Sequence, residues 1–303
     1  MRTCNCNLSF ANTGTVGCKS LMAVGRKLIL VPTYDSTGVR NKIAANATIN
    51  AAYFSAAINN VDPTKRWYPT GLIDNIEDVR AEPIMETLAS QKKLFVQDGI
   101  RSFKGIIVEE TNILIEKYLA FQCKDFSAFI IDKERNLIGS YDGTDFYPIQ
   151  IDKDTFYPML VKTTDTTVQK IQLVFEYSRT ERDEDLRMIA ESEMAGANAL
   201  NLSGLLDVNA ASSAPATTGF VLKLTTDYGT FKTPVNVVGW VYTDFTLYNN
   251  TTDPSHASPI AHTVVENPNG TYDFSATLPS GDVIELDGIK TGYGAFVSTV
   301  TIP

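Results

Sequence analysis

The sequence predicts a β-rich α+β protein in two parts, a larger N-terminal domain and a small C-terminal β-sandwich. Up to about residue 205 the chain mixes strand-like and helix-like patterns and carries nearly all of the positive charge. Beyond it the strands are short and alternating, with no arginine and three lysines. Residues 209–219 are small and polar, as in a linker. A length of 303 residues fits two domains, which we place at 1–205 and 220–303 with a linker at 206–219.

The first half of the N-terminal domain is expected to hold a strand, a helix and an arm. A β-rich apolar run ended by proline predicts a strand at 27–32. Apolar residues at helical spacing predict a short helix at 48–58, with Thr48 as its cap. Residues 64–104 are polar with scattered large apolar side chains, which predicts a long, partly exposed β-arm. Around Asp98-Gly99 this arm has either two short strands joined by a turn or one bulged strand.

The second half of this domain contains its principal helix. Residues 109–121 carry an apolar face at helical spacing. A hairpin at 126–141 and a strongly alternating strand at 167–177 follow. Thr180 and Asp183 resemble a capping box, and the apolar residues after them recur at helical spacing. We therefore expect a last helix beginning near Asp183.

The C-terminal part shows seven short strands separated by turn residues. We expect these strands at Phe220–Leu224, Val235–Val241, Phe245–Leu247, Ile260–Val265, Tyr272–Ala276, Val283–Leu286 and Tyr293–Ile302. Trp240, in the second strand, is expected to be a core residue. This number and spacing of strands is typical of an immunoglobulin-like sandwich, here without the usual disulfide.

Charge and hydropathy exclude several classes of protein. The net charge is −9, and residues 199–303 contain nine acidic and three basic side chains. Because no long basic stripe exists, tight binding to nucleic acid is not expected. The first residues lack the apolar segment of a secretory signal, and no run of 18 apolar residues predicts a membrane span. We expect folding in a cytoplasm and no membrane partner.

The chain shows no catalytic constellation. The only histidines are His256 and His262, in a loop and a strand of the sandwich, and neither a nucleophile-elbow nor a phosphate-loop motif is present. We therefore expect no catalytic residues, no cofactor and no metal, and the protein is interpreted as a non-enzyme.

The cysteines are expected to be thiols. There are four of them: Cys4, Cys6, Cys18 and Cys123. The first three offer an alternative zinc set, which is disfavoured because the C-x-C spacing differs from the usual one.

The order of elements carries a family resemblance. A strand, an arm ending in Val96–Gly105, a single helix at 109–121, a hairpin at 126–141 and a strand at 168–177 together resemble the tail tube proteins of long-tailed bacteriophages. Those proteins pack two β-sheets with one helix and carry a long hairpin arm, and several end in an Ig-like domain. The cysteine-rich start and the 27–32 run are similar to structural proteins of phages infecting Bacteroidetes. The chain departs from the family in its segment 140–165, which is longer and richer in proline and aspartate than a minimal tube fold needs.

This resemblance implies an N-terminal tail-tube-like β-sandwich or barrel that forms the tube, followed by an Ig-like sandwich. It implies copies assembled into hexameric stacked rings in the host bacterial cytoplasm and carried in the virion, with other virion proteins as neighbours. Double-stranded DNA would pass through a negative lumen without specific binding. The charge-rich segment 179–187 and the arm supply the expected contacts between copies, and deletion of 64–83 is expected to leave a monomer. The candidate contact residues are Arg66, Trp67, Tyr68, Arg80, Arg101, Arg179, Glu181, Arg182, Asp183 and Glu184.

Two other interpretations of the chain stay open. One is a different virion component, such as a head–tail ring, neck or decoration protein. The other is a carbohydrate-binding or adhesin module, for which Trp240, Tyr272 and Tyr293 of the sandwich would supply aromatic surfaces.

Overall fold

The computed structural model describes residues 21–108, 110–230 and 232–303, and the chain forms two compact units. The first unit comprises the described residues up to Ala57 together with Asp62–Leu202. The second comprises Ile58–Val61 and Ser203–Pro303. Cys4, Cys6 and Cys18 lie outside the described residues. Among the residues that are described, no helix is long and apolar enough to cross a membrane.

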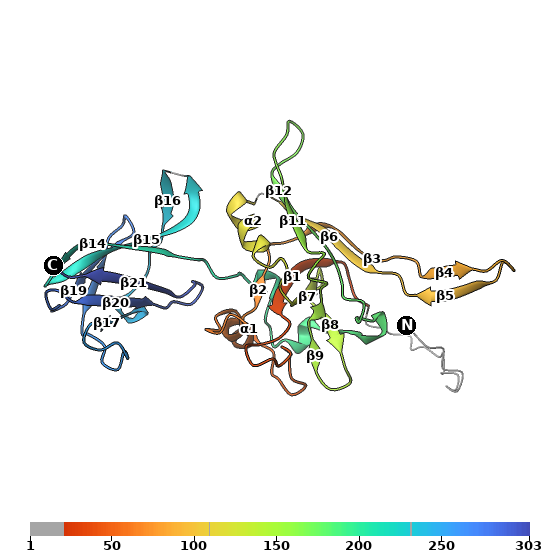
Figure 1. Cartoon of the computed structure of the whole chain (residues 1–303), viewed down its shortest axis with the longest axis horizontal. Helices are drawn as coiled ribbons and strands as arrows, with labels where there is room; N and C mark the ends of the chain where they lie inside the picture. Colours follow the sequence, from red (N-terminus) through yellow and green to blue (C-terminus); the bar gives the residue numbers. More distant parts are fainter. Residues whose placement is uncertain (1–20, 109, 231) are drawn as a thin grey trace. The chain divides into compact units, whose positions relative to one another are not determined.

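The first unit is built from two main antiparallel sheets, a separate two-stranded sheet and the helices α1 and α2 (Figure 1). One sheet has the order β13-β8-β7-β1-β2, with β10 beside β7 and β9 beside β8; the other has the order β11-β12-β6-β3. The elements are β1 (Gly25–Pro32), α1 (Ala51–Ile58), β2 (Tyr68–Pro69), β3 (Asp74–Arg80), β4 (Ile84–Thr87), β5 (Lys93–Gln97), β6 (Arg101–Val108), α2 (Asn112–Leu119), β7 (Phe126–Asp132), β8 (Leu137–Tyr141), β9 (Phe146–Tyr147), β10 (Ile149–Gln150), β11 (Tyr157–Val161), β12 (Lys170–Glu176) and β13 (Leu186–Ile189).

The core of this unit surrounds β1 and β7. All seven residues of β7 are buried, because both faces of the strand are covered. On one face Leu28 and Ile130 lie in a cluster with Phe175 of the second sheet. On the other face Trp67 packs 5.1 Å from Phe129, between their ring centres. A strand that is buried on both faces has a continuous run of apolar residues. The run at 27–32 predicted β1 for this reason.

Most of the expected elements of the first unit are confirmed. β1, α1, α2, the β7–β8 hairpin and β12 occur where the patterns place them. The cap of α1 is a correction, because Asn50 and not Thr48 accepts the hydrogen bond from the Tyr53 N–H, at 2.9 Å. The arm is also present: β5 and β6 follow each other along one side of it, interrupted at 98–100, which fits one irregular strand and not a turn.

The expected helix after Asp183 is wrong. Asp183–Asp185 form a single 3-10 turn, and Leu186–Ile189 continue as β13. Leu186 pairs with Ser140 and Ile189 with Leu137, at the free edge of β8. The hydrogen bonds of a neighbouring strand therefore override a weak helical period, as tertiary context commonly does.

The second unit consists of two antiparallel sheets that share one core. The five-stranded sheet has the order β14-β15-β19-β18 with β16 beside β15, and the three-stranded sheet is β17-β20-β21. Phe220 and Leu222 from the first sheet and Ile284 and Leu286 from the second lie in one buried cluster with Trp240. The elements are β14 (Asn209–Ala216), β15 (Gly219–Thr230), β16 (Thr233–Asn236), β17 (Phe245–Asn249), β18 (Thr263–Glu266), β19 (Thr271–Ser275), β20 (Val283–Gly288) and β21 (Phe296–Thr301).

Two expectations for this unit need correction. The stretch 209–219 is not a linker: β14 occupies 209–216 and pairs with β15, for example Ser212 with Leu222. Its small residues look like a linker in composition, but the neighbouring strand supplies the hydrogen bonds that composition cannot reveal. Trp240 is buried as expected, at 1% exposed, but it follows β16 and does not lie in a strand.

Lys27 is a buried lysine whose charge affects stability. Its side chain is 5% exposed, and its ammonium donates to the carbonyl oxygens of Leu200, at 2.8 Å, and of Leu202. Burial lowers the pKa of Lys27 from 10.5 to about 8. Between these values the unfolded chain holds a proton that the folded chain has lost, so stability rises with pH in that window.

We expect the free energy of unfolding of the wild type to increase relative to that of Lys27→Met between about pH 8 and pH 10.5, by on the order of 1–3 kcal/mol. Below pH 8 the difference between the two proteins should be constant, because the lysine is charged in both states. Urea unfolding at several pH values measures it. Parallel curves across the whole range would contradict the assignment.

Candidate interaction site

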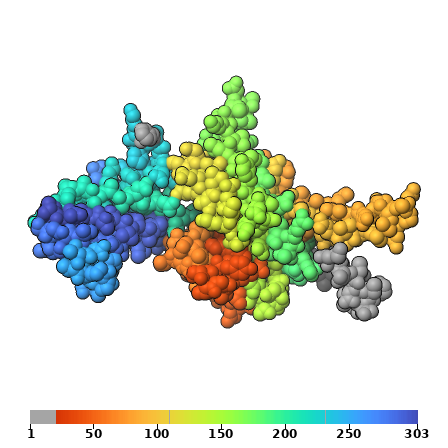
Figure 2. Space-filling view, in the orientation of Figure 1, coloured from red at the N-terminus to blue at the C-terminus, as the bar shows by residue number. Residues whose placement is uncertain are grey.

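The most unusual feature of the first unit is the far end of its arm. β3 and β6 belong to the four-stranded sheet, and beyond their paired ends β4 and β5 form a separate two-stranded sheet (Figure 1). In the space-filling view this segment, 84–97, projects from the other described residues of its unit (Figure 2). No other strand pairs with β4 or β5 in the described part of the chain, so both outer edges keep unpaired backbone groups.

The side chains of this arm are more apolar than those of an ordinary exposed hairpin. Its large apolar residues are between 38% and 49% exposed: Ile84, Met85, Leu88, Leu94 and Phe95. Met85 faces Phe95 across the two strands. The other projecting hairpin of this unit, between β11 and β12, carries mainly threonine and charged residues at 162–167. The β4–β5 arm is therefore the hairpin suited to a protein contact.

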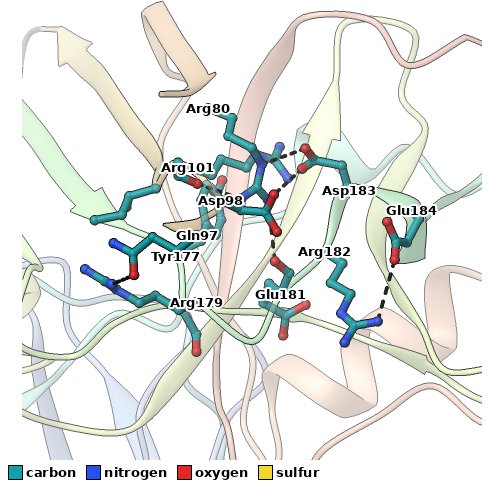
Figure 3. A pocket seen from close by; sticks show the side chains of 13 residues that line it. Arg80, Gln97, Asp98, Arg101, Tyr177, Arg179, Glu181, Arg182, Asp183 and Glu184 are labelled. Carbon is teal, nitrogen blue, oxygen red and sulfur yellow. Dashed lines mark hydrogen bonds and ion pairs between the residues drawn. The ribbon is translucent and has the colours of Figure 1, made fainter. Parts of the chain in front are cut away.

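The root of the arm is held to the segment 178–185 by an ion pair and by hydrogen bonds. Arg80 binds Asp183 with two hydrogen bonds, Nε to Oδ2 at 2.6 Å and Nη2 to Oδ1 at 2.9 Å (Figure 3). A third nitrogen of Arg80 donates to the carbonyl of Gly99 at 2.9 Å. Arg179 reaches Gln97 of β5 at 3.3 Å. These contacts tie both sides of the arm to one segment and fix the direction in which the arm leaves the sheet.

A second arginine, Arg101, stabilises the root by joining β6 to β3. Arg101 forms two hydrogen bonds with Asp78, at 2.7 and 2.6 Å, and its guanidinium lies 4.7 Å from the centre of the Tyr177 ring. Burial alone would lower the pKa of Arg101, but the hydrogen bonds to Asp78 and the nearby negative charges leave it raised. Burial raises the pKa of Tyr177 well above its ordinary value. Arg101 therefore stays charged and Tyr177 stays neutral over the whole physiological range.

Glu181 joins the root to the other sheet. One of its carboxylate oxygens accepts from Arg40 at 3.2 Å and from the backbone N–H of Gln150 at 3.1 Å. Arg182 and Glu184 form a looser, exposed pair at 3.6 Å. Arginine–carboxylate pairs with two parallel hydrogen bonds are more geometrically specific than such loose pairs. Rigidity at the root therefore comes mainly from Arg80 and Arg101.

The structure brings most of the sequence-predicted residues together. Seven of the ten candidates line a single hollow of about 300 Å³ at the arm root (Figure 3): Arg80, Arg101, Arg179, Glu181, Arg182, Asp183 and Glu184. The hollow also includes Gln97, Asp98 and Gly99, which were not singled out; the Asp98-Gly99 turn signal marked their position. Arg40 was missed as well, because nothing in its local sequence links it to Glu181.

The other three candidates lie elsewhere. Trp67 is a core residue, 5% exposed, and packs against Phe54 and Phe129. The expectation that Trp67 contacts another copy is therefore corrected. Tyr68 packs on Phe121 at 5.3 Å. Arg66 is partly buried and outside the hollow. The residues 66–68 thus pack within the first unit and do not project from it.

Comparison with known proteins gives no family for this chain: no protein-family model matches it, and no curated protein matches it. Function must therefore be inferred from the geometry. In the hollow the arginines Arg80 and Arg101 are each bound by a carboxylate, an arrangement that holds backbone segments together. The charged groups of the root are thus bound within the chain, and the exposed apolar side chains lie on the arm.

The Arg80–Asp183 pair makes a pH-dependent contribution to stability. The hydrogen bond from Arg80 lowers the pKa of Asp183 below its ordinary 3.8. The contribution is therefore present above about pH 4 and is lost as the pH falls through the folded-state pKa. Because the Asp183 side chain is 55% exposed, we expect Asp183→Asn to cost no more than about 1 kcal/mol.

Urea unfolding of Asp183→Asn and the wild type from pH 7 to pH 2.5 measures this contribution. The difference between the two should shrink toward zero at the acidic end. Glu184→Gln serves as the control, because its contact with Arg182 is long and exposed. A difference that stays constant down to pH 2.5 would rule out the pair as its source.

Proposed function

We propose that this chain is a structural protein that assembles with copies of itself through the β4–β5 arm. The observation that carries the proposal is the isolated two-stranded sheet, whose apolar side chains are left exposed by the described part of the chain. A lone two-stranded hairpin is marginally stable in water at best. Exposed apolar clusters on a soluble unit commonly mark contact surfaces. An arm of this kind is stabilised when another copy covers it and pairs with its edges.

Rigidity at the root supports this role. A contact between copies is tighter when the contacting segment is already oriented, because less conformational entropy is lost on binding. Arg80 and Arg179 join the arm to the segment 178–185, and Arg101 joins β6 to β3 through Asp78. Together these contacts supply this orientation. An arm that leaves one copy and docks on the next makes a head-to-tail contact, and such contacts produce rings or filaments.

Among assemblies of this kind we propose the tail tube of a long-tailed bacteriophage, with six copies in each of the stacked rings. The support is the resemblance in element order, the pairing of two main sheets with two short helices, one of which (α2) lies where the single helix of the family is expected, and a C-terminal β-sandwich that we interpret as Ig-like. The net charge of −9 suits a lumen through which DNA passes without binding. The protein would be assembled in the cytoplasm of the host bacterium, reside in the virion and act without catalysis.

The carbohydrate-binding interpretation loses its main support. Trp240 and Tyr272 are 1% and 0% exposed in the sandwich core, so neither ring offers a face to a sugar. Another ring-forming virion component, of the head–tail or neck kind, remains the second candidate because it would use the same arm.

Electron microscopy of the purified full-length protein tests the proposal. Stacked rings or tubes are expected, and their number should increase with protein concentration. Closed rings that never stack would favour the head–tail component. Single particles of the size of one chain at every concentration would refute self-assembly.

A further inference from the structure

The outer face of the three-stranded sheet in the second unit carries a cluster of metal-ligating side chains that the assembly role does not use. Glu285 and Asp287 lie two residues apart on β20, and the residues between and beside them, Ile284 and Leu286, point into the core. Successive side chains of a strand point to opposite faces, so both carboxylates lie on the outer face. The loop 250–262, between β17 and β18, brings His256 to the same place.

The three side chains are close enough to share one ion. One ligand atom from each of His256, Glu285 and Asp287 lies within 4.8 Å of the other two. His256 Nε2 is 3.4 Å from a Glu285 oxygen. Two ligands bound about 2.1 Å from a tetrahedral zinc ion are separated by about 3.4 Å. The first pair therefore already has the required spacing, and Asp287 places an oxygen within 4.8 Å of both partners.

A second, independent observation concerns Asp287. Its Oδ1 atom is buried and has no hydrogen-bond partner in the described part of the chain. A buried carboxylate oxygen without a partner is costly, and each such atom in a folded protein needs an explanation. No lysine or arginine forms an ion pair with Glu285 or Asp287 among the described residues; the one basic partner found there is His256. Two carboxylates at close range thus lack a compensating cation.

The surroundings orient the ligands. The His256 ring stacks on Tyr248, with ring centres 4.5 Å apart and planes inclined by 12°. The amide of Asn250 donates to the other Glu285 oxygen at 3.2 Å. Groups that hold the ligands in this way are typical of protein metal sites. Side-chain exposures of 30% for His256 and 17% for Glu285 leave an entry path for an ion.

We propose that His256, Glu285 and Asp287 form a binding site for a divalent transition-metal ion, with Zn²⁺ as the representative ion. One imidazole nitrogen with two carboxylates is a ligand set that favours zinc and its first-row neighbours over Ca²⁺ or Mg²⁺, which prefer oxygen ligands alone. The bound ion joins the loop 250–262 to β20 and stabilises the second unit. This site is independent of the arm and of the proposed assembly.

Isothermal titration calorimetry with Zn²⁺ on chelator-treated full-length protein tests the site. Cys4, Cys6, Cys18 and Cys123 are alkylated first, because thiolates also bind zinc. We expect one ion per chain at pH 7.5 and an increase of several degrees in the melting temperature. His256→Gln, Glu285→Gln and Asp287→Asn should each weaken binding at least tenfold, and His262→Gln, which changes the other histidine, should not.

Three outcomes would overturn the proposal. They are the absence of saturable Zn²⁺ binding, unchanged binding in all three ligand variants, and equally tight binding of Ca²⁺ or Mg²⁺. Melting curves without metal check that each variant is folded. Without metal, Asp287→Asn should melt at or above the wild-type temperature, because it removes an uncompensated charge; a large drop would mean that Asp287 has a purely structural role.

Discussion

Replacing Ile84–Gln97 with Asn-Gly is expected to give a folded protein that no longer assembles at any concentration. The change removes β4, β5 and the turn between them, and these residues contribute nothing to the buried core of the first unit. Pro83 and Asp98 then lie on either side of a two-residue loop, a length and composition suited to a β-hairpin. Circular dichroism and melting should differ little from the wild type, while sedimentation velocity should show one species of the size of a single chain.

The placement of this truncation differs from the deletion suggested by the sequence. Removing 64–83 would also remove Trp67 and Ile73, which are 5% and 0% exposed, and the protein would unfold. Phe95→Asp keeps the length of the arm and is expected to weaken assembly strongly. Val265→Asp, at a position 62% exposed in the second unit, provides the matched control. Tubes formed by the truncated protein would exclude the arm from the interface.

Gly99→Val is expected to disrupt assembly as severely without changing any side chain of the arm. A Cβ atom at Gly99 would lie 1.8 Å from the carbonyl oxygen of Ala81, a separation that no real contact allows. The two sides of the arm must therefore move apart at the root. This movement also breaks the hydrogen bond from Arg80 to the Gly99 carbonyl. We expect a loss of stability of about 1–3 kcal/mol and an arm that points away from its binding position.

The neighbouring variant Asp98→Asn is the control for this effect, because it changes an exposed side chain at the same root and leaves the backbone in place. Sedimentation velocity and electron microscopy should show wild-type assembly for Asp98→Asn and mainly single chains for Gly99→Val. Normal assembly of a folded Gly99→Val protein would show that the direction of the arm is unimportant.

The sequence predicted the elements with the strongest local patterns. β1 and β7 are apolar runs buried on both faces, and β12 alternates along its length, so these strands follow from residue order alone. β13 and β14 could not be predicted in this way. Each is weakly patterned and is a strand because a neighbour supplies its hydrogen bonds. Pairing between distant segments carries no local signal.

The sequence predicted the segments that form the candidate site but not the contacts between them. The charge-rich segment after β12 and the arm were both recognisable, and the structure places them together at the arm root. Their partners were not predictable: Arg80 and Asp183 are 103 positions apart, and no local pattern joins them. His256 lies in a loop, as the sequence predicted, but only the fold brings it to Glu285.

Hydrogen exchange of the arm amides tests the central claim most directly. In dilute protein the amides at the outer edges of β4 and β5 should exchange rapidly, because their hydrogen bonds have no cover. In assembled protein the same amides, within Ile84–Gln97, should become strongly protected while those of β7 stay protected throughout. An assembled particle in which the arm amides exchange as fast as in the single chain would contradict the claim.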